Sequence, residues 1–265
     1  MENIIYNVVG GRYYVLKHIG FGGYSHVYKV RDVYSGRFYA MKKYITSDPA
    51  NQKNLLEGME KELNALKYCM HPVLPKILNI IKEEEHFYLI MEYIEGINLK
   101  EYVARNGTLK IRKLKEVMEQ VCSGLFYLHS LEPPVIYRDL KPSNIILKRD
   151  ESIKLIDFGI AKRYSRDVID EQALGSRGFA APEQFGDAKG MGLFNTDIRT
   201  DIYGIGTTMY YLLTGDNYRI GFFSHRVRGK IRKIIKKCTQ INPNMRYQNC
   251  IEVLCDMKSL HNIGK

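Results

Sequence analysis

A short polar stretch between two apolar ones carries the residues best suited to chemistry. In VIYRDLKPSNIIL, at 135–147, seven positions hold Arg138, Asp139, Lys141, Ser143 and Asn144. An aspartate fixed beside a buried strand can orient a hydroxyl group and accept its proton. Lys141 and Asn144 could neutralise a transferring phosphoryl group and hold a metal ion. Ionisable groups this dense beside a core favour a ligand site, although this stretch alone also fits an ordinary polar loop.

A second candidate carboxylate comes thirteen residues after Asn144. In KLIDFGIA, at 154–161, Asp157 follows an apolar strand, and Gly159 lets the backbone turn sharply just after it. A carboxylate at a strand end beside an asparagine suits Mg²⁺, which takes oxygen ligands and is usually shared with substrate phosphates. Asn144 and Asp157 are therefore the candidate metal ligands.

A glycine-rich turn and a lysine stand upstream of these acids. In IGFGGYSHVY, at 19–28, Gly20 and Gly22 allow the backbone to approach phosphate groups, although hairpins also use glycine for turns. Lys42 follows on an alternating strand, and Glu62 lies among the apolar positions of a predicted helix. An acid on a core-facing stripe needs a partner, and Lys42 is the obvious one. Alternatively, Glu62 lies at the edge of the stripe and reaches water.

The hydrophobic pattern changes from strand-like to helix-like along the chain. Segments rich in Tyr, Val, Ile and Phe predict an antiparallel meander over 13–43 and two further strands near 77–82 and 86–92. Apolar residues at helical spacing predict helices at 51–69, 114–131, 201–213, 230–239 and 247–260. We therefore expect a strand-rich N-terminal lobe and a helix-rich C-terminal lobe that meet near 93–98.

Taken in order, these motifs resemble those of eukaryotic-type Ser/Thr protein kinases, of the compact kind found in bacteria. The resemblance covers about residues 13–260 and includes AMK at 40–42, YRD at 137–139, DFG at 157–159 and APE at 181–183. It implies an α+β, bilobal protein kinase fold in a single domain, 1–265. An N-lobe at about 1–93 would hold an antiparallel sheet and one main helix. A hinge at about 92–98 would lead to a mainly α-helical C-lobe at about 99–265.

The resemblance implies a set of nucleotide-binding residues. Lys42 would bind the α- and β-phosphates of ATP, with Glu62 as its helix partner. Met91 resembles the gatekeeper, and Glu92 to Ile94 resemble the hinge whose backbone binds adenine. The full set implied in ATP binding is Gly20, Gly22, Ser25 (in place of the third glycine), Val27, Ala40, Lys42, Met91, Glu92, Ile94 and Ile146.

The resemblance also implies catalytic roles. Asp139 would orient a substrate hydroxyl and accept its proton, and Lys141 would stabilise the transferring phosphoryl group. Asn144 and Asp157 would hold Mg²⁺, with Mn²⁺ as an alternative. Lys141, two positions after Asp139, is typical of Ser/Thr kinases, and Ser176 resembles the hydroxyl residue that contacts the catalytic loop in that class.

Three further positions resemble the residues that support this loop. Tyr137 replaces the usual His and is expected to pack structurally. Asp201 would hold the catalytic loop through backbone hydrogen bonds, and Glu183 would pair with Arg246.

One departure from the family pattern lies between the DFG and APE motifs. This segment has no threonine and a single serine, Ser165, which lies early, while Asp167, Asp170 and Glu171 follow. In kinases with an arginine before the catalytic aspartate, a phosphate in this segment often neutralises that arginine. One hypothesis is that one of the three acids pairs with Arg138 and makes loop phosphorylation unnecessary. The alternative is that the acids are simply solvated.

Positive charge is concentrated in the last quarter of the chain. The formal net charge is +11, and no acid occurs between Asp216 and Glu252, where nine Lys and Arg residues stand. The stretch 215–230 is short and irregular where kinases usually have a longer segment with its own helix. We expect an acidic protein partner at 219–237, ahead of nucleic acid, since no motif of an RNA-binding module appears. The alternative is a solvated face of the helix at 230–239.

Composition limits the class of protein. Hydrophobic residues make up 45% and charged residues 26%, which is typical of globular proteins, and no apolar run reaches the length of a membrane span. The first residues lack the features of a signal peptide, and the five cysteines fit free, buried thiols in a reducing cytoplasm. We expect an active, non-specific Ser/Thr protein kinase that acts on protein substrates, itself included. A nucleotide-binding pseudokinase scaffold and a small-molecule phosphotransferase are the alternatives.

Overall fold

The computed structural model describes residues 8–22, 25–44, 69–83, 86–159, 161–164, 175–185 and 196–260. The chain divides into two compact units, which we treat separately. The first comprises Met1–Met70 and Pro75–Glu95, and the second comprises His71–Leu74 and Gly96–Lys265. The chain leaves the first unit for the last time between Glu95 and Gly96.

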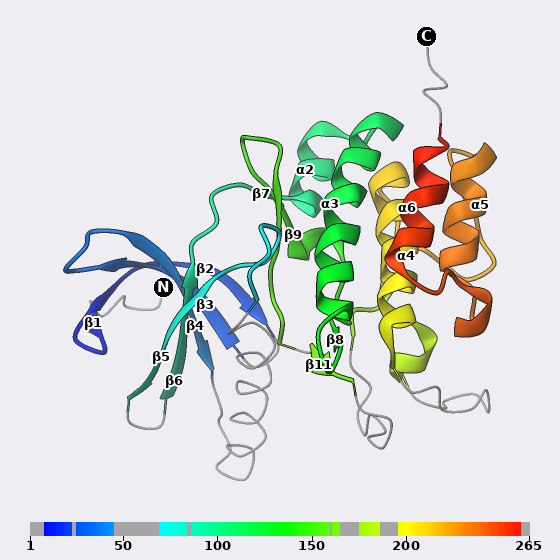
Figure 1. Cartoon of the computed structure of the whole chain (residues 1–265). Coiled ribbons are helices and arrows are strands. Elements are labelled where there is room, and N and C mark those ends of the chain that lie inside the picture. Colours follow the sequence, from blue (N-terminus) through cyan, green and yellow to red (C-terminus); the bar gives the residue numbers. More distant parts are fainter. Residues whose placement is uncertain are drawn as a thin grey trace. The chain divides into compact units, whose positions relative to one another are not determined.

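The first unit is built on a six-stranded antiparallel sheet with the strand order β1-β2-β3-β4-β6-β5 (Figure 1). Its core contains Val30, Met41 and Ile90, which are almost fully buried. The predicted meander and the two following strands are confirmed. The strands are β1 (Val8–Val9), β2 (Tyr13–Gly22), β3 (Ser25–Asp32), β4 (Phe38–Tyr44), β5 (Ile77–Glu83) and β6 (His86–Glu92).

Asp32 fixes the turn that joins β3 to β4. Its buried carboxylate accepts hydrogen bonds from the backbone N–H groups of Tyr34 (2.9 Å) and Ser35 (3.1 Å) and from Arg12 Nε (2.8 Å). The hydrogen bond from Arg12 is the main reason why the pKa of Asp32 is lowered to about 2. The turn is therefore anchored by an ionised carboxylate.

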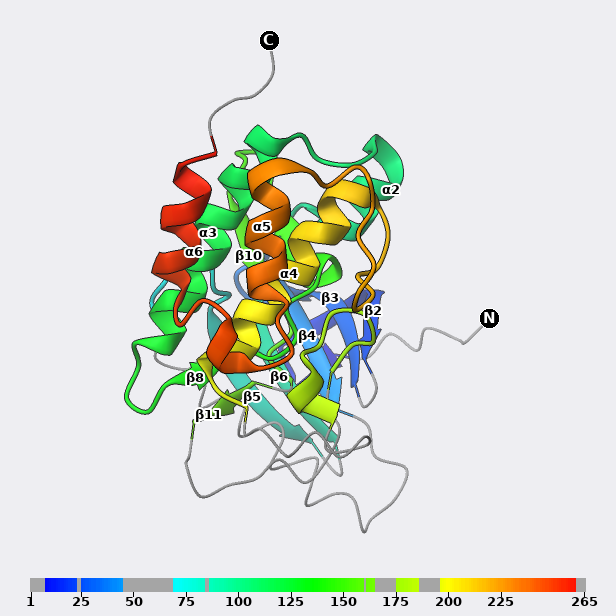
Figure 2. The same cartoon turned by 90° about the vertical axis from the view of Figure 1, so that its right-hand side faces the viewer.

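The second unit is mainly helical, and α3, α4, α5 and α6 pack against one another (Figure 2). In α5 the buried residues form one apolar stripe, Ile231, Ile234, Ile235 and Cys238, as the spacing predicts, whereas α4 is buried along most of its length. The helices of this unit within the described ranges are α2 (Leu99–Asn106), α3 (Ile111–His129), α4 (Ile198–Thr214), α5 (Gly229–Cys238) and α6 (Cys250–Lys258).

Short strands and single helical turns connect these helices. The strand order is β10-β9-β7 in one small sheet and β11-β8 in another. These strands are β7 (Ile97–Asn98), β8 (Val135–Ile136), β9 (Ile145–Leu147), β10 (Ile153–Leu155) and β11 (Lys162–Arg163). The 3-10 turns are η2 (Pro142–Asn144), η3 (Pro182–Phe185) and η4 (Pro243–Met245).

Capping residues explain where the observed helices differ from the predicted ones. The helix predicted at 201–213 begins earlier because Asp197 caps it, with Thr200 completing a capping box. It ends at Thr214, where the C-cap Gly215 has a left-handed φ of 81° that glycine adopts easily. The helix predicted from 247 begins only at Cys250, because Asn249 is its N-cap.

Two sequence interpretations concern membranes and thiols. None of the helices in the described ranges combines the length and the apolar character needed to cross a bilayer. All five cysteines are free. Three of them are buried, but Cys69 is half-buried and Cys255 is exposed, so the expectation that all five are buried was wrong.

Candidate active site

Residues 137–144 connect β8 to β9, and two of their side chains converge on Asp139. The Asp139 carboxylate accepts hydrogen bonds from Lys141 Nζ (2.7 Å), Asn144 Nδ2 (3.0 Å) and Ser176 Oγ (2.8 Å). Lys141 Nζ also donates to Ser176 Oγ at 2.6 Å. The structure thus brings together Asp139, Lys141 and Asn144, and adds Ser176 from a segment far along the chain.

The environment of Asp139 favours a proton acceptor. The side chain is 10% exposed, and this burial raises the pKa of Asp139 above its usual value. Lys141, which bonds the same carboxylate, acts in the opposite direction, while the charge of Asp157 adds to the increase. A carboxylate that is partly desolvated but still held by a cation is suited to accept a proton from a hydroxyl group.

Asp201 holds the backbone of this loop through hydrogen bonds to its N–H groups. Its fully buried carboxylate, on α4, accepts the backbone N–H groups of Tyr137 (2.8 Å) and Arg138 (2.7 Å). It also bonds Nε2 of His129 at 2.8 Å, and because a carboxylate only accepts, that nitrogen must carry the proton. The prediction that Asp201 holds the loop by backbone hydrogen bonds is confirmed.

The backbone directly before Asp139 is strained. Arg138 adopts a φ of 66°, in the left-handed region that non-glycine residues avoid. Two contacts secure it: its N–H donates to Asp201, and its carbonyl accepts from Gln184 Nε2 at 2.9 Å. Strained backbone held by buried partners is common at functional sites.

Tyr137 packs as a structural residue, as predicted. It is fully buried, and its ring meets Phe158 edge to face with centroids 4.8 Å apart. Its hydroxyl donates to the carbonyl of Ile156. The tyrosine therefore ties the loop that carries Asp139 to the segment that carries Asp157.

Asn144 and Asp157 are suited to hold a hard cation. The N–H of Ile156 donates to the carbonyl of Asn144 at 2.9 Å, so Asp157 follows a residue that is bonded directly to Asn144. The amide nitrogen of Asn144 faces Asp139, which turns its oxygen the other way. Within the described ranges, no cluster of three or more His, Cys, Asp or Glu side chains could hold a metal. Two oxygen ligands are nonetheless a typical protein contribution to Mg²⁺, because substrate phosphates and water complete its coordination.

The APE motif is anchored by a buried ion pair. Arg246 donates to both carboxylate oxygens of Glu183, at 2.7 and 2.8 Å, and both side chains are essentially inaccessible to solvent. Thr200 Oγ1 donates to the same carboxylate at 3.0 Å. The predicted pairing is confirmed, and it fixes the segment whose Gln184 supports Arg138.

The nucleotide-binding residues predicted in the first unit lie on neighbouring strands. Gly20 pairs with Val27, and Val27 pairs with Lys42, so β2, β3 and β4 bring these three positions into one row. Ala40 pairs with Met91 on β6. Lys42 is buried, and its Nζ lies 5.3 Å from the centre of the Tyr44 ring.

The other predicted residues lie as follows. Gly22 pairs with Ser25 at the end of the β2–β3 hairpin. Glu92 ends β6, and Ile94 follows it without regular structure. Ile146 lies in β9, between Lys154 of β10 and Asn98 of β7.

Some predictions fall outside the described residues, and some contacts were not predicted. Glu62 and the helix predicted at 51–69, apart from Cys69, lie outside the described ranges, as do Ser165, Asp167, Asp170 and Glu171. His129 and Gln184 were missed. A lone histidine at the end of an amphipathic helix gives no signal of its own. The Gln184 contact depends on a fold-specific approach of two loops.

Comparison with known proteins agrees with this geometry. The family model described as "Protein kinase domain" matches residues 13–260. The chain is 31% identical to "Serine/threonine-protein kinase PrkC" of Bacillus subtilis, over 95% of this chain and 41% of the relative. It is 30% identical to "Serine/threonine-protein kinase B" of Synechocystis, over 93% of this chain and 46% of that protein. The chain therefore spans less than half the length of these relatives.

Proposed function

The chain belongs to the protein kinase domain family, and from this premise we propose that it transfers the γ-phosphoryl group of ATP to serine and threonine hydroxyls of proteins, its own included. The observation that carries the proposal is the Asp139 carboxylate, which accepts hydrogen bonds from Lys141, Asn144 and Ser176. Asp201 holds the backbone just before it. Each of these groups has a use in phosphoryl transfer, where catalysis consists mainly of positioning and charge neutralisation.

Asp139 orients the attacking hydroxyl and accepts its proton. Lys141 neutralises negative charge on the transferring group, and its second contact, to Ser176, keeps the ammonium in place. Lys42 binds the α- and β-phosphates, with Glu62 as its partner. The glycine-rich hairpin and the residues around Met91 contact the rest of the nucleotide.

Asn144 and Asp157 hold Mg²⁺, or Mn²⁺ in its place, through an amide and a carboxylate oxygen. The metal supplies charge neutralisation on the phosphate oxygens. The relatives' names support ATP-dependent chemistry of the Ser/Thr class. The contact between Lys141 and Ser176 supports the same class from this chain's own residues.

The same proposal covers the organisation and setting of the domain. Residues 1–265 form one kinase domain, residues 92–98 act as its hinge, and the enzyme works in the cytoplasm. Lys42, Asp139, Asn144 and Asp157 are all present, which favours an active enzyme over a pseudokinase scaffold. An acidic protein partner binds near residues 219–237.

The test is transfer of phosphate to matched peptides. Purified protein is incubated with Mg²⁺, ATP and peptides that differ only in carrying serine, threonine, tyrosine or alanine at one position. We expect a mass increase of about 80 daltons, that of one phosphoryl group, on the serine and threonine peptides alone. Asp139→Asn should abolish it. Transfer to sugars or aminoglycosides but to no peptide would favour a small-molecule phosphotransferase.

A further inference from the structure

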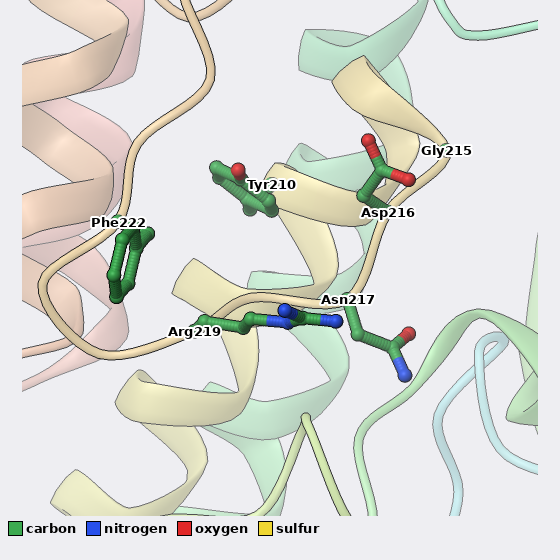
Figure 3. Close-up of a pocket in the computed structure, with 6 residues that line it drawn as sticks. All are labelled: Tyr210, Gly215, Asp216, Asn217, Arg219 and Phe222. Carbon is green, nitrogen blue, oxygen red and sulfur yellow. The ribbon is translucent and has the colours of Figure 1, made fainter.

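The irregular stretch after α4 forms a pocket that the proposed chemistry does not use. Residues 215–228 contain no helix, and Arg219 and Phe222 form an isolated bridge around Gly221, whose φ is 84°. The pocket has a volume of about 550 Å³ (Figure 3). It is lined by Tyr210, Gly215, Asp216, Asn217, Arg219 and Phe222.

Aromatic contacts and a hydrogen bond hold one wall of this pocket. The ring of Tyr210 meets those of Tyr218 and Phe223 edge to face, with centroids 5.4 and 5.8 Å apart. The hydroxyl of Tyr210 accepts the N–H of Ser224 at 3.1 Å. In contrast, the Phe222 side chain is 73% exposed, so an apolar group is available to a partner at the rim.

One arginine lines the pocket, and two more contact residues next to its lining. Arg219 lines it, and Figure 3 shows its guanidinium group extending away from Phe222 toward the Asn217 side. Arg226 donates to the carbonyl of Thr214 at 3.1 Å, next to the lining residue Gly215. Arg232 lies 4.9 Å above the ring of Phe223, which packs on Tyr210. Guanidinium groups bind carboxylates through paired hydrogen bonds, which makes them well suited to acidic side chains.

The wider surface has the same sign of charge. Asp216 lines the pocket, but no other acid follows before Glu252. Arg246 was counted with the basic stretch from the sequence, and this was wrong in part: it is buried against Glu183. The exposed cations of the stretch are Arg219, Arg226, Arg228, Lys230, Arg232, Lys233, Lys236 and Lys237.

The pocket is also linked to Asp139 by a short path. Ser176 donates to Asp139, and two residues later Gly178 packs so closely on Asn217 that a Cβ there would lie 3.0 Å from the asparagine side chain. The ring of Phe179 lies 5.8 Å from that of Tyr211, the neighbour of Tyr210. The segment that bonds Asp139 therefore also packs against a residue that lines the pocket.

We infer that this pocket, with Arg219 in its lining and Arg226 and Arg232 beside it, docks an acidic segment of the protein substrate. Carboxylates of that segment bind Arg219, Arg226 and Arg232, and an apolar side chain packs on Phe222. The word substrate rests on the proposed kinase activity, whereas the preference for an acidic segment is a binding property that needs no transfer of phosphate. Arg219 is thus a residue that determines specificity and takes no part in the chemical step.

The first experiment measures binding alone. The anisotropy of a fluorescent serine peptide rich in glutamate is compared with that of the same peptide carrying glutamine at each glutamate position. Arg219→Glu should weaken binding of the glutamate peptide at least about tenfold, which corresponds to about 1.4 kcal/mol. The matched control is Arg149→Glu, which changes an exposed arginine in the turn between β9 and β10 and should leave binding as in the wild type. Added salt should weaken binding of the glutamate peptide more than binding of the glutamine peptide, because salt screens exposed charges.

The outcomes are distinct. Equal binding of the two peptides, or the same loss in Arg219→Glu and Arg149→Glu, would overturn the inference. So would tighter binding of single-stranded RNA or phosphatidylserine vesicles than of the glutamate peptide. If binding behaves as expected, transfer is then measured: Arg219→Glu should raise KM for the glutamate peptide and leave kcat unchanged. Selective binding without any transfer would contradict the proposed kinase activity while leaving the docking site intact.

Discussion

Replacing Asp201 by asparagine tests the idea that this buried carboxylate positions the catalytic loop. The aspartate receives three N–H donors: one at Oδ1, from Arg138, and two at Oδ2, from Tyr137 and His129. An asparagine has only one acceptor atom, so at least one donor must face an NH₂ group. The side chain is enclosed, and water therefore cannot satisfy the donor that is lost.

The expected loss of stability follows from these three bonds. A hydrogen bond to a charged group contributes about 1.5–3 kcal/mol, and one to a neutral group about 0.5–1.5 kcal/mol. Losing one bond and weakening two should lower the free energy of unfolding by about 4 kcal/mol. For a chain of this size, 1 kcal/mol shifts Tm by roughly 2–4 °C, so Tm should fall by about 8–16 °C.

Activity should fall as well, for a separate reason. Arg138 holds a φ of 66°, a strain of order 1–3 kcal/mol that its contacts offset. Once the bond at Oδ1 is lost, the backbone before Asp139 can relax, and a displacement of about 1 Å at a catalytic group can cost roughly a hundredfold in rate. We expect kcat for a serine peptide to fall by that factor, with little change in KM for ATP.

Asp197→Asn is the matched control. It makes the same substitution at the N-cap of the same helix, where asparagine and aspartate serve almost equally well. Calorimetry should find that Tm for this variant falls by much less than for Asp201→Asn, because only the partly exposed ion pair of Asp197 with Arg199 is weakened. The reasoning is refuted if Asp201→Asn keeps the wild-type Tm, or if it loses stability but retains full kcat at a temperature where it remains folded.

Three further predictions concern charged groups. Arg246→Met should lower the free energy of unfolding by about 3–5 kcal/mol, because it leaves the Glu183 carboxylate buried without a counter-charge. In urea unfolding, adding Glu183→Leu should recover much of the lost stability. A double variant whose loss is the sum of the two single losses would contradict the ion-pair argument. Asp32→Asn should be less stable than the wild type above pH 3.8, and the difference should vanish as pH falls from 3.8 to about 2, because the Arg12 hydrogen bond lowers the pKa of the folded Asp32 carboxyl; a difference that is independent of pH over that window would argue against this origin. The acid limb of kcat against pH should have its midpoint above 3.8, because burial raises the pKa of Asp139 and only the ionised form accepts a proton; a midpoint at or below 3.8 would show that another group controls the rate.

Much of the fold followed from periodicity, and the gaps have physical causes. The predicted α+β protein kinase fold is confirmed, with an antiparallel sheet in the first unit and a mainly helical second unit. The helix α2 was not delimited, although Asn98 followed by Glu101 is a helix-start signal: the Asn98 side chain accepts the Glu101 N–H at 2.9 Å. The two-residue strands β7, β8 and β11 are too short to show any period.

The site residues that could be predicted are either close in sequence or part of a family motif. Asp139, Lys141 and Asn144 lie within six positions, and the partners Ser176, Asp201 and Glu183 followed from the family pattern. His129 was not predicted, because its bond to Asp201 spans 72 positions and depends on how α3 packs on α4. Arg246 was counted with the basic stretch after Asp216, but the family pattern also paired it with Glu183, and the buried ion pair shows that the second interpretation is the right one.

The central claim is that Asp139 and its neighbours carry out phosphoryl transfer. The most direct test is the intact mass of the purified protein and of Asp139→Asn after incubation with Mg²⁺, ATP and a serine peptide, together with thermal shifts on adding ATP. The account predicts that both proteins are stabilised by ATP, and that only the wild type adds mass, in steps of about 80 daltons, to itself or to the peptide. Stabilisation of both proteins with no transfer by either would contradict it and identify a nucleotide-binding scaffold.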